Sequence, residues 1–252
     1  MQRLSVVIVC KNGAKVIDET IKSFSRLTDD ILIYDNGSTD GTKEIVKQSN
    51  ARLVEGSWEG FGKTKNKGNS LAKYDWILSL DADEAIDEEL KEHLLQLDLS
   101  DGKKVFEFKF KNFLGAKWLR YGEWGDDKHI RLFNRKKINW NDADVHESLL
   151  LPKDVKVISI PGYVLHKTAP DIASYEHKME NYAVLNAEKY FKQQKSAGSF
   201  KMFFSAAFSF IKNYFFKLGF LDGTTGYHCA RINARYTFLK YKKLNERWNK
   251  KQ

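Results

Sequence analysis

The chain has 252 residues, of which 42% are hydrophobic and 30% are charged, and it contains only 3 prolines. This length and composition exclude a disordered chain and allow one well-buried α/β domain with a small appendage, but not two large domains. The two cysteines, Cys10 and Cys229, are too few for a disulfide framework, and the formal net charge of +9 indicates an anionic partner without identifying its class.

The chain starts with a short apolar stretch at residues 5–10. This stretch is too short for the hydrophobic region of a signal peptide and far too short for a membrane-spanning helix. We therefore interpret it as a first β-strand and expect a cytoplasmic protein.

Short runs of β-forming residues alternate with helical patterns along the first hundred residues. In the first helical pattern, apolar side chains recur every three or four positions from Val16 to Phe24, and residues 88–97 repeat this spacing. Such alternation predicts a parallel sheet covered by helices. The predicted strands are residues 4–9, 31–34, 52–55 and 76–80.

The pattern changes after residue 102. From Phe106 to Lys111 aromatic and charged residues alternate, which is the period of a half-exposed strand, so we expect a mixed sheet here. A long helical pattern then fills residues 171–194, behind the helix breaker Pro170.

Residues 199–221 are crowded with phenylalanine but interrupted by lysines, and a basic segment follows them. This stretch is too charged to span a bilayer, yet its aromatic and cationic side chains suit the headgroup region of an anionic membrane surface. A helical hairpin packed on the catalytic domain, or a dimer interface, is the alternative interpretation. The basic residues are Arg231, Arg235, Lys240, Lys242, Lys243, Arg247, Lys250 and Lys251.

Polar motifs follow each predicted strand, at the edge where open α/β sheets bind ligands. Cys10 and Asn12 follow the first strand, and the second is followed by residues 35–41. There Gly37 permits a tight turn beside Ser38, while Asp35 can accept hydrogen bonds from a nucleobase or ribose. Taken alone, residues 35–41 also fit an ordinary turn.

The third motif contains Lys65 and Asn66, and we expect it at a helix start, where cations and backbone amides can face a diphosphate. The fourth is Asp81-Ala82-Asp83, directly after the last strand. Because alternate residues of an extended segment point the same way, both carboxylates can reach one divalent ion. Oxygen ligands suit Mg²⁺ or Mn²⁺ bridged to a diphosphate.

In this order, residues 5–9, 35–41, 65–68 and 80–84 resemble the motifs of the family 2 glycosyltransferases, which have a GT-A fold. The resemblance implies a Rossmann-like, mostly parallel α/β sheet with helices on both faces, here followed by a helical C-terminal extension. It also implies a nucleoside-diphosphate-sugar donor, a divalent metal, Mg²⁺ or Mn²⁺, and inversion at the anomeric carbon.

The same resemblance implies roles for individual residues. Asp35 would contact the nucleobase, Asp81 would lie near the ribose, and Asp83 would bind the metal. Lys65 stands where the family usually has arginine, so a bidentate contact becomes a single one. Further donor contacts fall on Cys10, Asn12, Gly37, Ser38, Asn66 and Ala82.

The second half resembles a narrower group, the β-glucosyltransferases of lipopolysaccharide inner-core assembly, which add glucose to a core heptose. The resemblance implies a UDP-glucose donor and a core-oligosaccharide or glycolipid acceptor. Where that group has Trp-Tyr-Pro-Asp, this chain has Trp124-Gly125-Asp126-Asp127. The other matching segments are residues 131–133, 145–147, 166 and 219–223.

Inversion by direct displacement needs one carboxylate to accept the proton of the acceptor hydroxyl. Asp127 aligns with the single carboxylate of the resembling group and is the predicted base, with Asp126 and Glu147 as alternatives. His146 and Glu147 are predicted to position the acceptor, and Trp124 to form a platform for a sugar ring, with core packing as its alternative.

Two further residues have two interpretations each. Arg131 would bind the donor diphosphate or an acceptor phosphate, and the alternative is a surface ion pair. His166 would supply a third metal position beside Asp81 and Asp83, and the alternative is simple packing.

We therefore predict a catalytic domain at residues 1–170, with a nucleotide-sugar-binding half at 1–100 and an acceptor-binding half at 101–170. Residues 171–252 form the extension, and the enzyme lies at the inner leaflet of a bacterial inner membrane. The alternative is a polyprenyl-phosphate glycosyltransferase, which would share the motif pattern of the first hundred residues. Its acceptor is a phosphate, so it needs no general base. A nucleic-acid-binding protein would share the basic charge, but the chain has no recognised reader motif, so we expect no nucleic acid partner.

Overall fold

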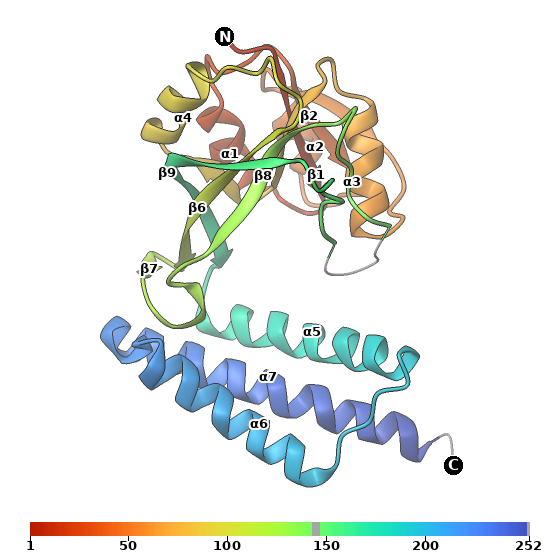
Figure 1. The fold of residues 1–252 in the computed structure, drawn as a ribbon, viewed down its shortest axis with the longest axis vertical. Coiled ribbons are helices and arrows are strands. Elements are labelled where there is room, and N and C mark those ends of the chain that lie inside the picture. Colours follow the sequence, from red (N-terminus) through yellow and green to blue (C-terminus); the bar gives the residue numbers. More distant parts are fainter. Residues whose placement is uncertain (143–146, 251–252) are drawn as a thin grey trace. The chain divides into compact units, whose positions relative to one another are not determined.

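A computed structural model describes residues 1–142 and 147–250, and its strands and helices alternate along the first hundred residues (Figure 1). The strands are β1 (Leu4–Cys10), β2 (Ile31–Asp35), β3 (Arg52–Glu55), β4 (Trp76–Asp81), β5 (Glu84–Ile86), β6 (Lys104–Leu114), β7 (Lys117–Leu119), β8 (Lys128–Asn134) and β9 (Lys156–Ala169). The α-helices are α1 (Ile17–Ser23), α2 (Thr42–Lys47), α3 (Phe61–Ser70), α4 (Glu88–Leu95), α5 (Ile172–Lys192), α6 (Ser199–Ile211) and α7 (Gly223–Asn249).

The chain forms two compact units. The first contains Met1–Phe110 and Lys128–His166, and the second contains Lys111–Asp127 and Lys167–Gln252. Residues 111–127, which we expected in the acceptor half, thus group with the C-terminal helices. The functional boundary at residue 170 stays a prediction.

The strands form one mixed sheet in the order β3-β2-β1-β4-β8-β6-β9-β5, with β7 paired to β6. β1 is central and parallel to both β2 and β4, so that Val6 lies opposite Ile31 on one side and Leu78 on the other. β8 then pairs antiparallel with β4 and with β6. The predicted parallel strands and the change to a mixed sheet are both present.

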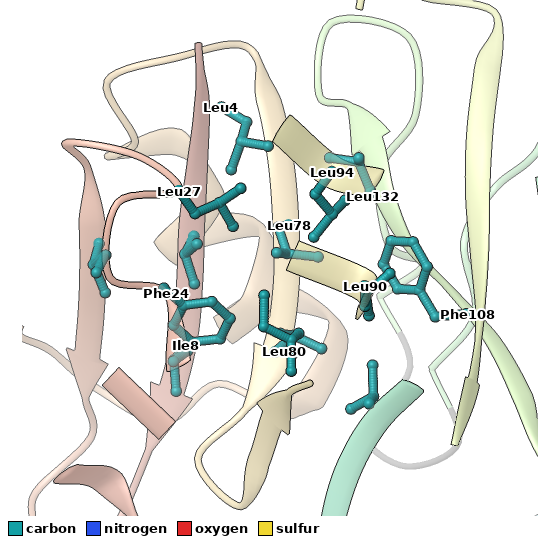
Figure 2. Close-up of a cluster of buried hydrophobic side chains, with 14 of the residues drawn as sticks. Leu4, Ile8, Phe24, Leu27, Leu78, Leu80, Leu90, Leu94, Phe108 and Leu132 are labelled. Carbon is teal, nitrogen blue, oxygen red and sulfur yellow. The ribbon is translucent and has the colours of Figure 1, made fainter. Parts of the chain in front are cut away.

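Helices cover both faces of this sheet. On one face, Leu4 and Ile8 of β1 share a buried cluster with Phe24 and with Leu90 and Leu94 of α4 (Figure 2). On the other face, Gly68 lets α3 approach β1, because a Cβ added at this position would lie 3.1 Å from Val7 Cγ1. The predicted α/β class with helices on both faces is confirmed.

The second unit consists mainly of α5, α6 and α7, with α7 packed against both other helices. The buried hydroxyl of Tyr175 in α5 donates a hydrogen bond of 3.0 Å to Asn233 Oδ1 in α7. The predicted helical C-terminal extension is confirmed. Within the described residues, no helix is long and apolar enough to cross a membrane.

Six of the eight basic residues predicted at the C-terminus, from Arg231 to Arg247, lie on α7, and several of them pair with glutamates of α5. The shortest N–O distance of each pair is 3.5 Å for Arg231 and Glu176, 2.7 Å for Arg235 and Glu180, and 3.5 Å for Arg247 and Glu188. These arginines therefore help to join two helices, a role that the sequence analysis did not assign to them.

Gly162 of β9 lies at a point where α4 packs closely on the sheet. Its φ is +93°, and a Cβ there would lie 2.3 Å from Leu90 N. We expect Gly162→Ala to lower the free energy of unfolding by about 3 kcal/mol, through backbone strain and overpacking together. Gly102→Ala is the control, because its Cβ would meet nothing closer than 3.5 Å. Urea unfolding that shows equal losses for the two variants would contradict this packing.

Candidate active site

A cavity of about 330 Å³ lies at the carboxyl ends of β1, β2 and β4, within the first unit. This is the sheet edge at which open α/β folds bind ligands, as the sequence motifs predicted. Its lining residues are Val9, Cys10, Lys11, Asn36, Trp58, Phe61, Lys65 and Asp81.

The two carboxylate oxygens of Asp35, at the end of β2, differ in their hydrogen bonding. Oδ1 accepts hydrogen bonds from the backbone N–H groups of Gly37 and Ser38, at 3.0 and 2.9 Å. Among the described residues, Oδ2 has no hydrogen-bond partner although it is buried, and the same holds for Oδ1 of the neighbouring Asn36. Because buried polar atoms are normally satisfied, this corner suits a ligand that brings hydrogen-bond donors.

The loops after β1 and β2 are tied together by Asn12 and Ser38. The backbone N–H of Asn12 donates to Ser38 Oγ at 2.8 Å, and Asn12 Oδ1 accepts from Thr39 N at 2.9 Å. Cys10 is buried beside Gly13, where an added Cβ would lie 2.8 Å from the thiol sulfur. These three predicted donor residues thus shape the cavity wall, and Asn12 and Ser38 do so through contacts within the protein.

Two aromatic residues of the cavity, Trp58 and Phe61, were not predicted from the sequence. Their ring centroids are 4.7 Å apart at 87°, and the Trp58 side chain is 44% exposed. Both flank Gly60, the N-cap of α3, whose φ is 92°. The sequence feature that could have indicated them is the presence of two aromatic residues in an otherwise polar connection between a strand and a helix. Lys11 was also missed, although it belongs to the motif after the first strand.

The expected helix start at residues 65–68 is wrong. α3 begins at Phe61, so Lys65 lies in its second turn and the backbone amides of residues 65–68 are inside the helix. Only the side chains of this motif can therefore face a ligand. The helix starts earlier because Gly60 supplies the positive φ at its N-cap.

Lys65 is the centre of a buried charge cluster and is only 3% exposed. Its Nζ lies 2.7 Å from Glu147 Oε1 and 3.1 Å from Asp81 Oδ1, and 4.8 Å from the centre of the Trp140 ring. Burial alone would lower the pKa of Lys65, but the Asp81 and Glu147 carboxylates outweigh it and raise this pKa above its usual value. Lys65 is therefore a permanent cation in this cluster.

Arg131 of β8 is the second cation of the cluster. Its Nη2 is hydrogen-bonded to Glu84 and lies 3.4 Å from Asp81 Oδ2. Although burial would raise the pKa of Asp81, Lys65 and Arg131 together hold it well below its usual range. Arg131 is thus buried beside carboxylates of the cluster, and the predicted surface alternative for its ion pair is wrong.

Asn66 holds the backbone of Trp140. Its amide nitrogen donates to the Trp140 carbonyl at 2.9 Å, while its Oδ1 accepts from the Trp140 N–H at 3.0 Å. Trp140 in turn forms an isolated bridge with Leu149. The predicted donor contact of Asn66 stays a prediction, since both of its polar groups here hold the protein backbone.

Asp83 and His166 come together, as the predicted metal site requires. His166 Nε2 lies 3.5 Å from Asp83 Oδ2, because β5 and β9 pair in a register that places Glu84 opposite His166. Within residues 1–142 and 147–250, no group of three or more His, Cys, Asp or Glu side chains could hold a metal by itself. Asp83 and His166 thus fit two positions around a divalent ion, and the remaining ligands would have to come from a diphosphate or water.

Ala82 lies in the first unit, where its carbonyl accepts a hydrogen bond of 2.8 Å from Thr20 Oγ1. The other remaining predicted residues lie in the second unit or outside the described residues. Asp127 Oδ2 accepts a hydrogen bond of 2.8 Å from Asn112 Nδ2. Trp124 packs beside Tyr175 in a buried apolar cluster, with ring centroids 6.2 Å apart. Asp126 also belongs to this unit, and His146 lies outside the described residues. Their catalytic and acceptor roles stay predictions.

Comparison with known proteins gives a family match over most of the first unit. The family model described as glycosyl transferase family 2 matches residues 5–155. An uncharacterized glycosyltransferase of Rickettsia typhi is 27% identical over 263 residues, which cover 98% of this chain and 88% of that protein. The lipopolysaccharide core biosynthesis glycosyltransferase LpsC of Rhizobium meliloti is 26% identical over 255 residues, covering 97% of this chain and 92% of LpsC. Among solved structures, TarS of S. aureus aligns with a TM-score of 0.47 and 17% identity over 100% of this chain and 92% of that chain.

The buried position of Lys65 leads to a stability prediction. We expect Lys65→Met to lower the free energy of unfolding by about 3 kcal/mol, because it leaves the Asp81 and Glu147 carboxylates without their shared cation. Lys67→Met, on the same helix, is the control. Its ion pair with Glu59 is about half exposed on both sides, so its loss should cost less than about 1 kcal/mol. Chemical unfolding in which the two variants lose equal stability would contradict the importance of the buried pair.

Proposed function

The chain belongs to glycosyltransferase family 2, with the GT-A fold, and on this basis we propose that it is an inverting enzyme of lipopolysaccharide core assembly. The proposed reaction transfers glucose from UDP-glucose to a hydroxyl group of a lipopolysaccharide core or related bacterial glycan. The similarity to LpsC along almost the whole chain supports the acceptor class. The observation that carries the proposal is the cavity at the sheet edge, next to the half-satisfied carboxylate of Asp35 and the buried cluster around Lys65.

The donor nucleoside is proposed to bind in this cavity. Asp35 Oδ2 and Asn36 Oδ1 are buried acceptors without partners among the described residues, so they suit the N–H groups of a nucleobase. Trp58 and Phe61 provide apolar walls for the planar base. Cys10, Asn12, Gly37 and Ser38 hold the shape of this pocket.

The donor diphosphate is proposed to lie against Lys65 and Arg131, beside Asp81 and the backbone of Ala82. The two cations already stabilise the negative charge of Asp81, and they can share that role with phosphate oxygens. Asp83 and His166, with Asp81 near them, would hold Mg²⁺ or Mn²⁺. When bound, such an ion stabilises the developing charge of the departing diphosphate.

The acceptor hydroxyl is proposed to lose its proton to Asp127, as the aligned motif implies. Asp126 and Glu147 remain the alternatives, and the Glu147 carboxylate is paired with Lys65. Trp124, His146 and Glu147 are the proposed acceptor contacts. The acceptor is a core oligosaccharide or glycolipid, so the enzyme would work at the cytoplasmic inner leaflet, against an anionic membrane surface and without nucleic acid.

The first test concerns the donor and the metal. Wild-type protein should bind UDP-glucose more tightly than other nucleotide sugars and should need Mn²⁺ or Mg²⁺ to do so. Asp83→Asn should remove the metal dependence while the fold stays intact, because a coordinating charge is lost without a core cavity. Asp18→Asn is the control, since Asp18 is an exposed residue paired with Lys22. Calorimetry that finds the same manganese dependence in Asp83→Asn would show that the metal site is misassigned.

The second test concerns the base. Asp127→Asn should lower turnover about 100-fold or more with little change in donor affinity, because a general base acts in the transition state. Asp126→Asn should have a smaller effect. Steady-state transfer to a heptose-containing core acceptor, with donor binding measured separately, distinguishes the two. If only Glu147→Gln or Asp126→Asn loses turnover, that residue is the base, and if all three remain active, a phosphate acceptor becomes the better interpretation.

A further inference from the structure

The outer side of α6 carries the largest apolar side chains of the helix, and they are exposed. The exposed fractions are 82% for Phe200, 60% for Phe203 and Phe204, 48% for Phe208 and 43% for Ile211. The rings of Phe200, Phe204 and Phe208 stack in sequence, with centroid distances of 5.7 and 6.3 Å. We call these five side chains the phenylalanine face.

The side of α6 that faces α7 mixes small and polar residues with the half-buried Phe210, whose ring lies 6.0 Å from that of Tyr227, and the Phe203 ring lies 5.4 Å from that of Phe238. Met202, Ser205, Ala206 and Ser209 are half-buried, and α6 packs against α7 (Figure 1). No residue of α6 is fully buried. A helix that packs in water normally turns its largest apolar residues inward, whereas α6 leaves Phe200, Phe204 and Phe208 about half exposed or more.

The apolar surface continues beyond the helix. Phe215 and Phe216 are 53% and 72% exposed in the next turn, and Leu218, Phe220 and Leu221 are exposed as well. Together these residues extend the phenylalanine face into one run along the chain. Monomeric proteins rarely expose so many large apolar side chains in one stretch of chain unless that surface has a partner.

The charge of this segment selects the partner. Between residues 199 and 221 there is no acidic residue, whereas Lys201, Lys212 and Lys217 are all present. Two copies of the segment placed face to face would bring like charges together. A surface of anionic lipid headgroups over an apolar layer complements both the lysines and the rings.

We propose that the phenylalanine face docks on a bilayer that contains anionic lipid, with its rings at the boundary of headgroups and acyl chains. This deepens the proposed function and rests on it only in that a glycolipid acceptor would lie at the same surface. The basic residues of α7 have a smaller part than their number indicates, because Arg231, Arg235 and Arg247 pair with glutamates of α5. Binding should therefore depend mainly on the rings and only partly on charge.

The test is cosedimentation of the full chain with vesicles of phosphatidylcholine, with and without phosphatidylglycerol. Phe200→Ser combined with Phe204→Ser should weaken binding to the anionic vesicles at least about 10-fold, since two exposed rings no longer leave water. High salt should weaken wild-type binding without abolishing it. Leu71→Ser is the matched control, because Leu71 is an exposed apolar residue of the first unit, and it should bind as the wild type does.

Binding of UDP-glucose is measured by calorimetry on every variant. It should be unchanged, because donor binding is proposed in the first unit and does not involve the phenylalanine face. Failure of donor binding in the wild type would therefore count against the proposed function and not against docking. The docking proposal is wrong if the double variant binds vesicles as the wild type does. It is also wrong if the wild type ignores vesicles and instead forms a dimer that the double variant loses, which would make the face an interface between copies.

Discussion

The buried ammonium group of Lys65 is the interaction on which the candidate site depends. It is held by Asp81 at the end of β4 and by Glu147. Three parts of the chain that are far apart in sequence therefore meet at one charge. A buried charge is tolerated only when it is paired, so the positions of β4, α3 and the segment at residue 147 are coupled by electrostatics as well as by packing. This coupling places Lys65 on the wall of the cavity at the sheet edge, with Arg131 in the same charge cluster.

Much of the fold could be predicted because its elements have local causes. The central strands are apolar runs bounded by turn residues, and the observed β3 has the predicted bounds, while β1, β2 and β4 each extend one residue further. The start of α3 could not be predicted, because it depends on the positive φ of Gly60 rather than on periodicity. The roles of the α7 arginines could not be predicted either, since each pairs with a glutamate about 55 positions earlier in the chain.

The candidate site was predictable to the extent that it lies on strand ends. Asp35 and Asp81 are the last residues of β2 and β4, and Asp83 lies two residues after the end of β4, so all three belong to the same edge of the sheet. The approach of His166 to Asp83 depends on the register of β5 and β9, which no local pattern reveals. Trp58 and Phe61 were missed for a related reason: an aromatic residue in a connection can be packed or exposed, and only the tertiary structure decides. Which phenylalanines of α6 are exposed could not be predicted from the sequence either, because the packing of α7 determines which side of α6 is covered.

The buried position of Cys10 determines how its thiol reacts with electrophiles and oxidants. Burial, together with a smaller effect of the Asp35 carboxylate, raises the pKa of the Cys10 thiol to about 12. At neutral pH only about one molecule in 10⁵ would carry the thiolate, which is the form that reacts with electrophiles and oxidants. Cys10 should therefore react slowly with alkylating reagents and mild oxidants at neutral pH.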